Sequence, residues 1–146
     1  MDYDAAVDKI KRIIAQGSEV LQGVVDFLYT SFDRYSWVGI YLVEGDDLVL
    51  GPWRGEQATE HTRIPIGRGI CGSAARSGKT EIVPDVNADS RYLSCFVSTK
   101  SEIVVPIKRN GEVVGEIDID SDVVDAFKDE DALFLEKVAD MLSRYI

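Results

Sequence analysis

The chain begins with two stretches whose hydrophobic residues recur every three or four positions. In residues 2–16 this spacing predicts an amphipathic helix, and Gly17 ends the pattern. Residues 18–32 repeat the spacing, and Ser18 is the expected N-cap of the second helix. The pattern therefore predicts two helices within residues 1–35.

Short runs of β-branched and aromatic residues follow, separated by turn residues. Residues 36–44 and 48–53 flank a Gly-Asp-Asp turn, and residues 101–108 and 112–120 flank Asn110-Gly111. Short loops rich in Gly, Asn and Asp connect antiparallel strands, so each pair predicts a β-hairpin.

Shorter elements lie between and after these hairpins. The pattern predicts extended segments at residues 63–66 and 81–83, and a short helix at residues 70–76 that ends at Ser77-Gly78. Helical spacing returns from Phe127 onward. It predicts a C-terminal helix whose apolar face includes Leu133, Leu135, Val138 and Leu142.

The order of these elements favours an α+β fold. We expect a central antiparallel sheet formed within residues 36–146, with the N- and C-terminal helices packed on one face. The sequence shows no repeat, no low-complexity tract and no linker. Residues 1–146 are therefore expected to form a single domain.

Composition and charge exclude several classes of protein. The formal net charge of −10 argues against nucleic-acid binding, because phosphate contacts need clustered Lys and Arg. No stretch approaches the ~20 apolar residues that span a bilayer, and no basic leader precedes an apolar run. We therefore expect a cytoplasmic protein that does not bind membranes. With 2 cysteines and 1 histidine, the chain lacks zinc-site spacing, so neither a metal nor another cofactor is expected.

A thiol and several carboxyl groups lie close together around the second hairpin. Side chains alternate along a strand, so Glu116, Asp118 and Asp120 share one face. Cys95 precedes the hairpin by a few residues and is placed to reach that face. Because carboxylates raise the pKa of a thiol, the pairing suggests that the carboxyl groups act on a substrate while the sulfur attacks it. The alternative is that Asp118 and Asp120 face water on an edge strand.

Several motifs together resemble those of a known enzyme family. In chain order they are WVGIYLV, LVLGPWRGE, RIPIGRGICGSAA, VPDV, SEIVVPI and GEIDIDS. This succession resembles the free methionine-(R)-sulfoxide reductases, which have the GAF fold, and it extends from about Ser36 to the C-terminus. The resemblance implies a thiol-dependent oxidoreductase that reduces free methionine (R)-sulfoxide to methionine and serves antioxidant repair.

The resemblance also implies roles for individual residues. The family's catalytic cysteine lies six residues before the serine of the SEIV motif, as Cys95 does before Ser101. Cys95 would attack the sulfoxide sulfur and become a sulfenic acid. The family's acidic residues for substrate binding and catalysis match Glu102, Asp118 and Asp120, and its aromatic pocket matches Trp37 and Tyr41.

Carboxyl groups suit this chemistry because a sulfoxide is a poor electrophile until its oxygen is protonated or strongly hydrogen-bonded. A general acid typically contributes ~10²–10⁴-fold to the rate. Carboxyl groups crowded into a partly apolar pocket raise one another's pKa, so one stays protonated near neutrality. A remaining carboxylate is then free to pair with the amino group of the amino acid.

The loop before the RIP motif departs from the family pattern. Many members carry a further cysteine there, which resolves the oxidised catalytic sulfur as a disulfide. That position is Thr59 when counted forward from Gly55 and His61 when counted back from Arg63. The resolving thiol is therefore absent, and we expect an external thiol to be the reductant, with thioredoxin serving less well.

Cys71, Trp37 and Tyr41 can each be interpreted in two ways. Cys71 begins the short helix, where it is either a small buried residue or a secondary resolving thiol whose pKa the helix N-terminus lowers. Trp37 and Tyr41 are core residues, pocket residues or both. His61 is expected to be solvated in an acidic loop.

The main alternative function is a non-catalytic GAF sensor that binds a small molecule. A sensor needs an output domain or partner, for which a chain of 146 residues has no room. It would also leave the cysteine and the acidic cluster unexplained. A scaffold with a vestigial site is the third hypothesis, and it predicts that Cys95→Ser changes no measurable property.

Overall fold

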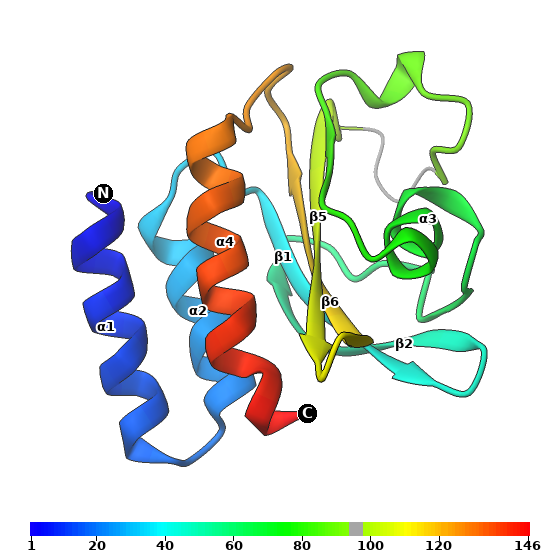
Figure 1. The fold of residues 1–146 in the computed structure, drawn as a ribbon. Helices are drawn as coiled ribbons and strands as arrows, with labels where there is room; N and C mark the ends of the chain where they lie inside the picture. Colours follow the sequence, from blue (N-terminus) through cyan, green and yellow to red (C-terminus); the bar gives the residue numbers. More distant parts are fainter. Residues whose placement is uncertain (94–97) are drawn as a thin grey trace.

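The computed structural model describes residues 1–93 and 98–146 (Figure 1). Its helices are α1 (Tyr3–Gln16), α2 (Val20–Ser31), α3 (Gly69–Ser77) and α4 (Asp129–Leu142), with short 3-10 helices η1 (Val86–Ala88) and η2 (Ser143–Tyr145). Its strands are β1 (Trp37–Glu44), β2 (Asp47–Gly55), β3 (Arg63–Pro65), β4 (Glu81–Val83), β5 (Ser101–Arg109) and β6 (Glu112–Ser121).

The strands described form one antiparallel sheet in the order β3-β2-β1-β6-β5-β4. The two predicted hairpins are confirmed, because β1 pairs with β2 and β5 pairs with β6. Strand β6 also pairs with β1, so both of its edges are hydrogen-bonded. The hypothesis that Asp118 and Asp120 occupy an edge strand is therefore wrong.

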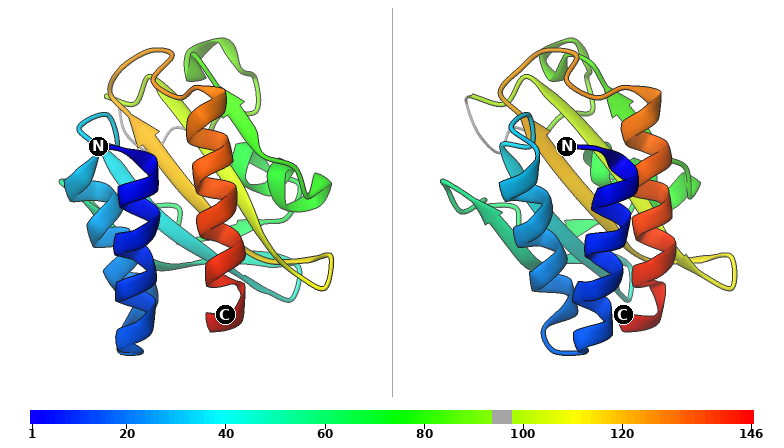
Figure 2. Two further views of the ribbon diagram at one scale, coloured as in Figure 1. Left: turned by 60° about the vertical axis from the view of Figure 1, so that its left-hand side comes forward. Right: turned by 90° about the vertical axis from the view of Figure 1, so that its left-hand side faces the viewer.

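Helices cover both faces of this sheet, but unequally. On one face α2 and α4 lie against the strands and α1 packs on them from outside (Figures 1 and 2). Their apolar sides meet alternate sheet residues, including Val38, Ile103 and Ile119, in the larger hydrophobic core. This arrangement confirms the α+β fold with the terminal helices on one face. The short helix α3 and its flanking loops cover the opposite face.

Glycines end two of the helices where the sequence predicts. Gly17 follows α1 with φ 72°, and Gly78 follows α3 with φ 69°, so both take the left-handed conformation that glycine adopts without steric cost. In each case the glycine N–H donates a hydrogen bond back to a helix carbonyl. Among the helices described, none is long and apolar enough to cross a membrane.

Two details of the predicted helices are wrong. Ser18 is not the N-cap of α2; Glu19 takes that place with φ 49° and makes no side-chain capping bond. Leu133 is 68% exposed and does not share the apolar face of α4. Because successive helical residues are ~100° apart, Leu133 and Leu135 point in nearly opposite directions. Phe134 faces the core instead.

Candidate active site

The sheet face beneath α3 carries four buried carboxyl groups. Glu116, Asp118 and Asp120 alternate along β6, and Glu102 lies on β5 directly opposite Asp120. Their exposed fractions are 5% for Glu102, 0% for Glu116 and 3% for each aspartate. The interpretation of Asp118 and Asp120 as a solvated face is therefore wrong. Burying ionised carboxylates is costly in free energy. Such a cluster is therefore stable only when its carboxyl groups are protonated or bind a ligand.

A turn with close backbone packing holds α3 over these acids. The Gly67 N–H donates to the Gly72 carbonyl at 2.8 Å, and the Gly72 N–H donates to the Arg68 carbonyl at 3.0 Å. A Cβ at position 72 would lie 2.8 Å from the Pro65 carbonyl oxygen. Glycine therefore lets the helix approach the turn, which places the neighbouring Cys71 against the sheet.

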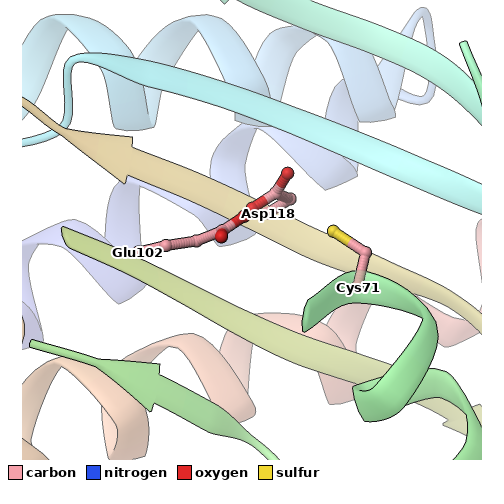
Figure 3. A group of neighbouring side chains, drawn as sticks. All are labelled: Cys71, Glu102 and Asp118. Carbon is pink, nitrogen blue, oxygen red and sulfur yellow. The ribbon is translucent and has the colours of Figure 1, made fainter. Parts of the chain in front are cut away.

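Cys71 faces the acids from above. Its sulfur and one carboxyl oxygen each of Glu102 and Asp118 lie within 4.8 Å of one another (Figure 3). Cys71 is buried, as the first of its two interpretations predicts. Burial, followed by the nearby Asp118 and Glu116, raises the pKa of this thiol well above its ordinary value. The expectation that a helix N-terminus lowers it is wrong, because desolvation and neighbouring negative charge outweigh one short helix.

The carboxyl groups of β6 favour their protonated forms. Desolvation raises the pKa of Glu116, Asp118 and Asp120, and the negative charge of Asp118 raises those of Glu116 and Asp120 further. Hydrogen bonding from Glu102 opposes this at both aspartates. The cluster therefore retains protons at a pH where isolated carboxyl groups are ionised.

Four oxygen atoms of this cluster are buried without a hydrogen-bond partner in the described part of the chain. They are both carboxyl oxygens of Glu116 and the Oδ1 atoms of Asp118 and Asp120. An unsatisfied buried polar atom costs ~1–3 kcal/mol, so these atoms mark places where a ligand or water improves the free energy. The period-two spacing of Glu116 from Asp118 predicts that it shares this face. Its place in the site was nevertheless not predicted from the sequence.

Two aromatic residues form one wall of the site. Trp37 and Tyr41 on β1 lie opposite Asp120 and Glu116 of β6, so they share the acidic face as their spacing predicts. Both are buried, and the Trp37 ring stacks on Trp53 with centroids 6.2 Å apart. Trp53 was not predicted as a site residue, although it lies in the returning strand of the same predicted hairpin.

The loop before β3 forms another wall. The Tyr41 hydroxyl donates to the backbone carbonyl of His61 at 2.7 Å, and the His61 N–H donates to Oγ1 of the buried Thr59 at 3.1 Å. His61 is half-buried and lines a cavity with Tyr41, Cys71, Glu102 and Asp118, so it is less exposed to solvent than its acidic loop predicts. One candidate position for the missing cysteine therefore borders the site.

Two cavities reach the acidic face. The one lined by Cys71, Glu102 and Asp118 has a volume of about 20 Å³, which admits a water molecule. The other is lined by Trp37 and Asp120 and has a volume of about 480 Å³. Only the larger one falls in the size range of small-molecule sites, ~300–1,000 Å³.

Known proteins share both the fold and the sequence of this chain. The family model that matches residues 16–146 is described as the GAF domain. The free methionine-R-sulfoxide reductase of Escherichia coli is 37% identical over 119 residues, which span 82% of this chain and 71% of that protein.

Two solved structures agree with this match. The free methionine-R-sulfoxide reductase of Neisseria meningitidis, solved in complex with its substrate, superposes with a TM-score of 0.89 at 37% identity over 97% of this chain and 86% of that one. The type II enzyme of Thermoplasma acidophilum gives 0.82 at 38% identity over 92% of each chain.

This chain belongs to the GAF-domain family of free methionine-R-sulfoxide reductases. The resemblance inferred from its motifs is thereby confirmed. The residues matched to the family's acidic and aromatic positions lie together on one sheet face, although their roles in this chain remain predictions. Cys95, matched to the catalytic cysteine of these reductases, lies outside the described residues.

An ion-paired arginine fixes the loop that leads toward Cys95. Arg91 donates to Glu81 on β4 at 3.1 Å and to Asp89 at 2.8 Å, and the second contact lowers the pKa of Asp89. These bonds tie residues after η1 to the edge of the sheet. No role for Arg91 follows from the sequence alone, because only the fold brings Glu81 close to it.

A metal ion is another ligand whose usual donor atoms are present on this face of the sheet. The thiol of Cys71 and the carboxyl groups of Glu102 and Asp118 are donors that transition metals accept. A metal must first displace the protons of its ligands. The raised pKa values of Cys71 and Asp118 oppose that displacement near neutral pH.

Proposed function

We propose that this protein reduces free methionine (R)-sulfoxide to methionine with Cys95 as the nucleophile. Four buried carboxyl groups beside a wall of aromatic residues carry this proposal. They suit a small substrate that brings both a polar sulfoxide and an ammonium group. The relatives named above, one of them solved with its substrate, support the same reaction class.

The acidic cluster supplies the proton that the sulfoxide needs. Asp118 and Asp120 hold protons beyond the usual pH range of an aspartate, because both are desolvated. A protonated carboxyl group next to the sulfoxide oxygen acts as a general acid and makes the sulfur electrophilic. Loss of that proton leaves a carboxylate, whose charge the substrate's ammonium group offsets.

The substrate is a free amino acid because its ammonium group is recognised at a buried position. Glu102 lies across from Asp120, so the two carboxyl groups surround a point where one cation neutralises their repulsion. A methionine sulfoxide inside a polypeptide has an amide in place of the ammonium group. It therefore brings no charge to the pair, and the site discriminates against it.

The thiol chemistry then proceeds in three balanced steps. Cys95 attacks the sulfoxide sulfur, the sulfoxide oxygen passes to the cysteine, and methionine leaves with Cys95 as a sulfenic acid. An external thiol displaces water from that sulfenic acid and forms a mixed disulfide. A second external thiol releases Cys95 as a thiol and departs as the disulfide of the reductant.

The absence of a cysteine at Thr59 and His61 supports an external reductant. Cys71 is the only other cysteine of the chain, and it is buried with a raised pKa, which makes it a poor attacking thiol. We therefore expect small thiols to sustain turnover and thioredoxin to do so poorly. This proposal places the protein in antioxidant repair of the free amino acid.

Turnover of separated methionine sulfoxide epimers tests the proposal. The protein is incubated with dithiothreitol and either the (R) or the (S) epimer, and methionine is quantified by mass spectrometry. We expect methionine from the (R) epimer alone, and none from a peptide containing (R) sulfoxide. Cys95→Ser is the matched inactive control, and Cys71→Ser is expected to remain active.

Trapping the oxidised protein tests the fate of Cys95. After one turnover without reductant, a sulfenic-acid probe is expected to label Cys95. A Cys71–Cys95 disulfide in good yield, together with efficient turnover by thioredoxin, would contradict the external-thiol step. If neither epimer yields methionine but the protein binds it tightly, the non-catalytic sensor is the better description.

A further inference from the structure

The sheet position opposite Asp118 carries no side chain of its own. Asp118 on β6 pairs with Gly39 on β1, and Gly39 pairs on its other side with Trp53 on β2. Side chains of directly paired residues share one face of a sheet, with Cβ atoms ~4.5–5.5 Å apart. The glycine therefore leaves space in this row, between the carboxyl group of Asp118 and the ring of Trp53.

The ring of Trp37 fills this space. A Cβ on Gly39 would lie 2.3 Å from Cη2 and 2.6 Å from Cζ3, at the far end of the Trp37 indole. A Cβ on Gly55, the partner of Trp37 on β2, would lie 2.3 Å from Cδ1 at the near end of the indole. These distances are well short of the ~3.5–4.0 Å at which two carbon atoms are in contact. Gly39 and Gly55 thus form a glycine seat, on which the indole packs directly against the backbone.

Trp53 supports the ring on the side away from Asp118. The rings of Trp37 and Trp53 have centroids 6.2 Å apart and planes inclined by 14°, which is typical of an offset-stacked aromatic pair. Because Trp53 and Asp118 are both partners of Gly39, the far end of the Trp37 ring lies between them. Movement of this ring away from the acid is therefore opposed by a second aromatic ring.

The Trp37 ring is an apolar neighbour of an acid whose other neighbours are mostly polar. Among the described residues, the titratable and charged groups around Asp118 are Glu116 and Asp120 on β6, Glu102 on β5, Cys71 on α3, Tyr41 on β1, and His61 and Arg68 on either side of β3. Hydrogen bonds from Glu102 and Cys71 lower the pKa of Asp118, but desolvation outweighs them and raises it. The apolar cover over Asp118 is therefore the part of its surroundings that retains the proton.

We propose that Gly39 is a positioning residue of the reductase site, which seats the Trp37 ring beside Asp118 so that the ring excludes water from this acid. The inference rests on the proposed function, in which the acidic cluster donates a proton to the sulfoxide oxygen. A general acid donates only while it still holds its proton. The glycine seat therefore sets the upper end of the pH range over which Asp118 serves in that role.

Gly39→Ala tests the seat directly. The three atoms nearest to the added Cβ all belong to the Trp37 ring, so the ring moves away while the backbone keeps its place. Water then reaches Asp118, the ionised form is penalised less, and the proton is lost at lower pH. Trp37→Phe is the second variant, because a shorter ring vacates the same space without a change in the backbone. It decides the question if Gly39→Ala does not fold.

Gly51→Ala is the matched control. Gly51 lies on β2 in the same hairpin, and its added Cβ would meet the Ile40 carbonyl oxygen at 3.1 Å and the Leu42 side chain. It makes the same change of residue in a strand but leaves the glycine seat intact. Urea unfolding shows that each variant is folded. Near-ultraviolet circular dichroism shows whether the ring has moved, because both tryptophans of the chain belong to the stacked pair.

Infrared spectroscopy over a range of pH measures the protonation of Asp118 without substrate or reductant. The carbonyl stretching band of a protonated carboxyl group disappears on ionisation, and Asp118→Asn identifies the band of this residue. In Gly39→Ala and Trp37→Phe, the midpoint is expected about one pH unit or more below that of the wild type. This is a fraction of the ~3–5 units that complete burial produces. Gly51→Ala is expected to leave the midpoint unchanged.

The pH dependence of turnover links this titration to the reaction. In Gly39→Ala and Trp37→Phe, kcat/KM for the (R) sulfoxide is expected to begin falling at correspondingly lower pH, because the general acid loses its proton earlier. A purely structural role of Gly39 would lower the free energy of unfolding and leave both the infrared midpoint and this pH profile in place.

Each outcome bears on one of the two proposals. The inference about Gly39 is overturned by an unchanged infrared midpoint in either folded variant, by an equal shift in Gly51→Ala, or by a Trp37 ring that does not move in Gly39→Ala. Methionine formation together with any of these results leaves the reductase activity in place. A shifted midpoint with no methionine formed by the wild type at any pH supports the role of the seat and contradicts the proposed function.

Discussion

Glu102 on β5 and Asp120 on β6 lie directly opposite each other in the middle of the sheet, and both are buried. Like charges across neighbouring strands repel, and burial removes the water that screens them. Desolvation accordingly raises the pKa of Asp120, and hydrogen bonding from Glu102 offsets part of that shift. The fold thus maintains an arrangement that is unfavourable without protons or a ligand.

Replacing either of these two carboxyl groups with an amide is expected to lower activity without lowering stability. Asp120→Asn and Glu102→Gln should each lower kcat/KM for the (R) sulfoxide by about 10²-fold or more, because a general acid or an ammonium partner is lost. The free energy of unfolding should stay level or rise, since each change replaces a desolvated ionisable group with a neutral amide that can still hydrogen-bond. Enzyme kinetics and urea unfolding measure the two quantities on the same preparations.

The exposed Glu112 on β6 provides the matched control for this pair. Glu112→Gln should leave both turnover and stability unchanged. Full activity in both the Asp120 and Glu102 variants would remove these residues from the reaction. Equal losses of stability in both would show instead that they hold the sheet together.

The two cysteines are expected to differ sharply in reactivity. Cys71 is buried and its pKa is raised, so iodoacetamide at pH 8 should not modify it in the folded protein. Cys95 should be modified, and turnover should fall in step with its modification, as followed by peptide mass spectrometry. Unfolding in urea should expose Cys71 to the same reagent. Rapid labelling of folded Cys71 with loss of activity in Cys71→Ser would reverse the assignment of roles.

Glu116 is expected to make stability depend on pH. Its folded pKa is raised well above 4.5 by desolvation and by Asp118. A raised pKa means that the folded state binds the proton more tightly, so this contribution is complete below pH 4.5 and is lost as pH rises through the folded pKa. Glu116→Gln removes the titration, so its stability relative to the wild type should increase from pH 5 upward.

Glu116→Leu tests the missing hydrogen bonds of the same residue. Both carboxyl oxygens lack a partner among the described residues, and a leucine there removes the unsatisfied atoms while keeping apolar volume. Unfolding free energy at pH 7 should rise by about 1–3 kcal/mol. Denaturant unfolding over a range of pH measures both effects. If Glu116→Gln and Glu116→Leu both lowered the free energy of unfolding by an amount independent of pH, both predictions would be contradicted.

Asp131 should be the strongest single determinant of stability outside the site. Its carboxyl group accepts hydrogen bonds from the hydroxyls of Tyr3 at 3.0 Å and Tyr35 at 2.7 Å, from Arg34 at 3.3 Å and from the Lys128 backbone N–H at 2.9 Å. These bonds join α1, the segment before β1 and the start of α4. Asp131→Ala should cost about 3–5 kcal/mol, because the buried Tyr35 hydroxyl is left without its partner and three partly buried hydrogen bonds are lost with it.

Tyr35→Phe is expected to lower the free energy of unfolding by less than Asp131→Ala does. It removes one donor and leaves Asp131 with its other partners, so a cost of about 1–2 kcal/mol is expected. Chemical denaturation gives both values, and kcat measured well below the unfolding midpoint should be unaffected in each variant. A cost below 1 kcal/mol for Asp131→Ala would show that solvent replaces these bonds.

The sequence by itself determined which segments fold and which residues share a face. Periods of 3.6 and 2 are local properties, so the helices, the two hairpins and the alternation of Glu116, Asp118 and Asp120 were predictable. Local spacing is less reliable at helix ends, where it predicts Ser18 as a cap although Glu19 takes that place. It also fails on α4, because it groups the exposed Leu133 with the buried Leu135. The succession of motifs from WVGIYLV to GEIDIDS is sufficient by itself to identify the family.

Only the tertiary structure decided which face was buried and what met there. The position of β6 between β1 and β5, together with α3 packed over that face of the sheet, placed Asp118 and Asp120 in the interior. Neither the central position of the strand nor the cover over its face follows from the local pattern. Cys71 lies 31 residues before Glu102 in sequence, yet its sulfur lies within 4.8 Å of a Glu102 oxygen. The pKa shifts follow from that burial and proximity, because desolvation and Coulomb interactions depend on distances that the folded chain alone sets.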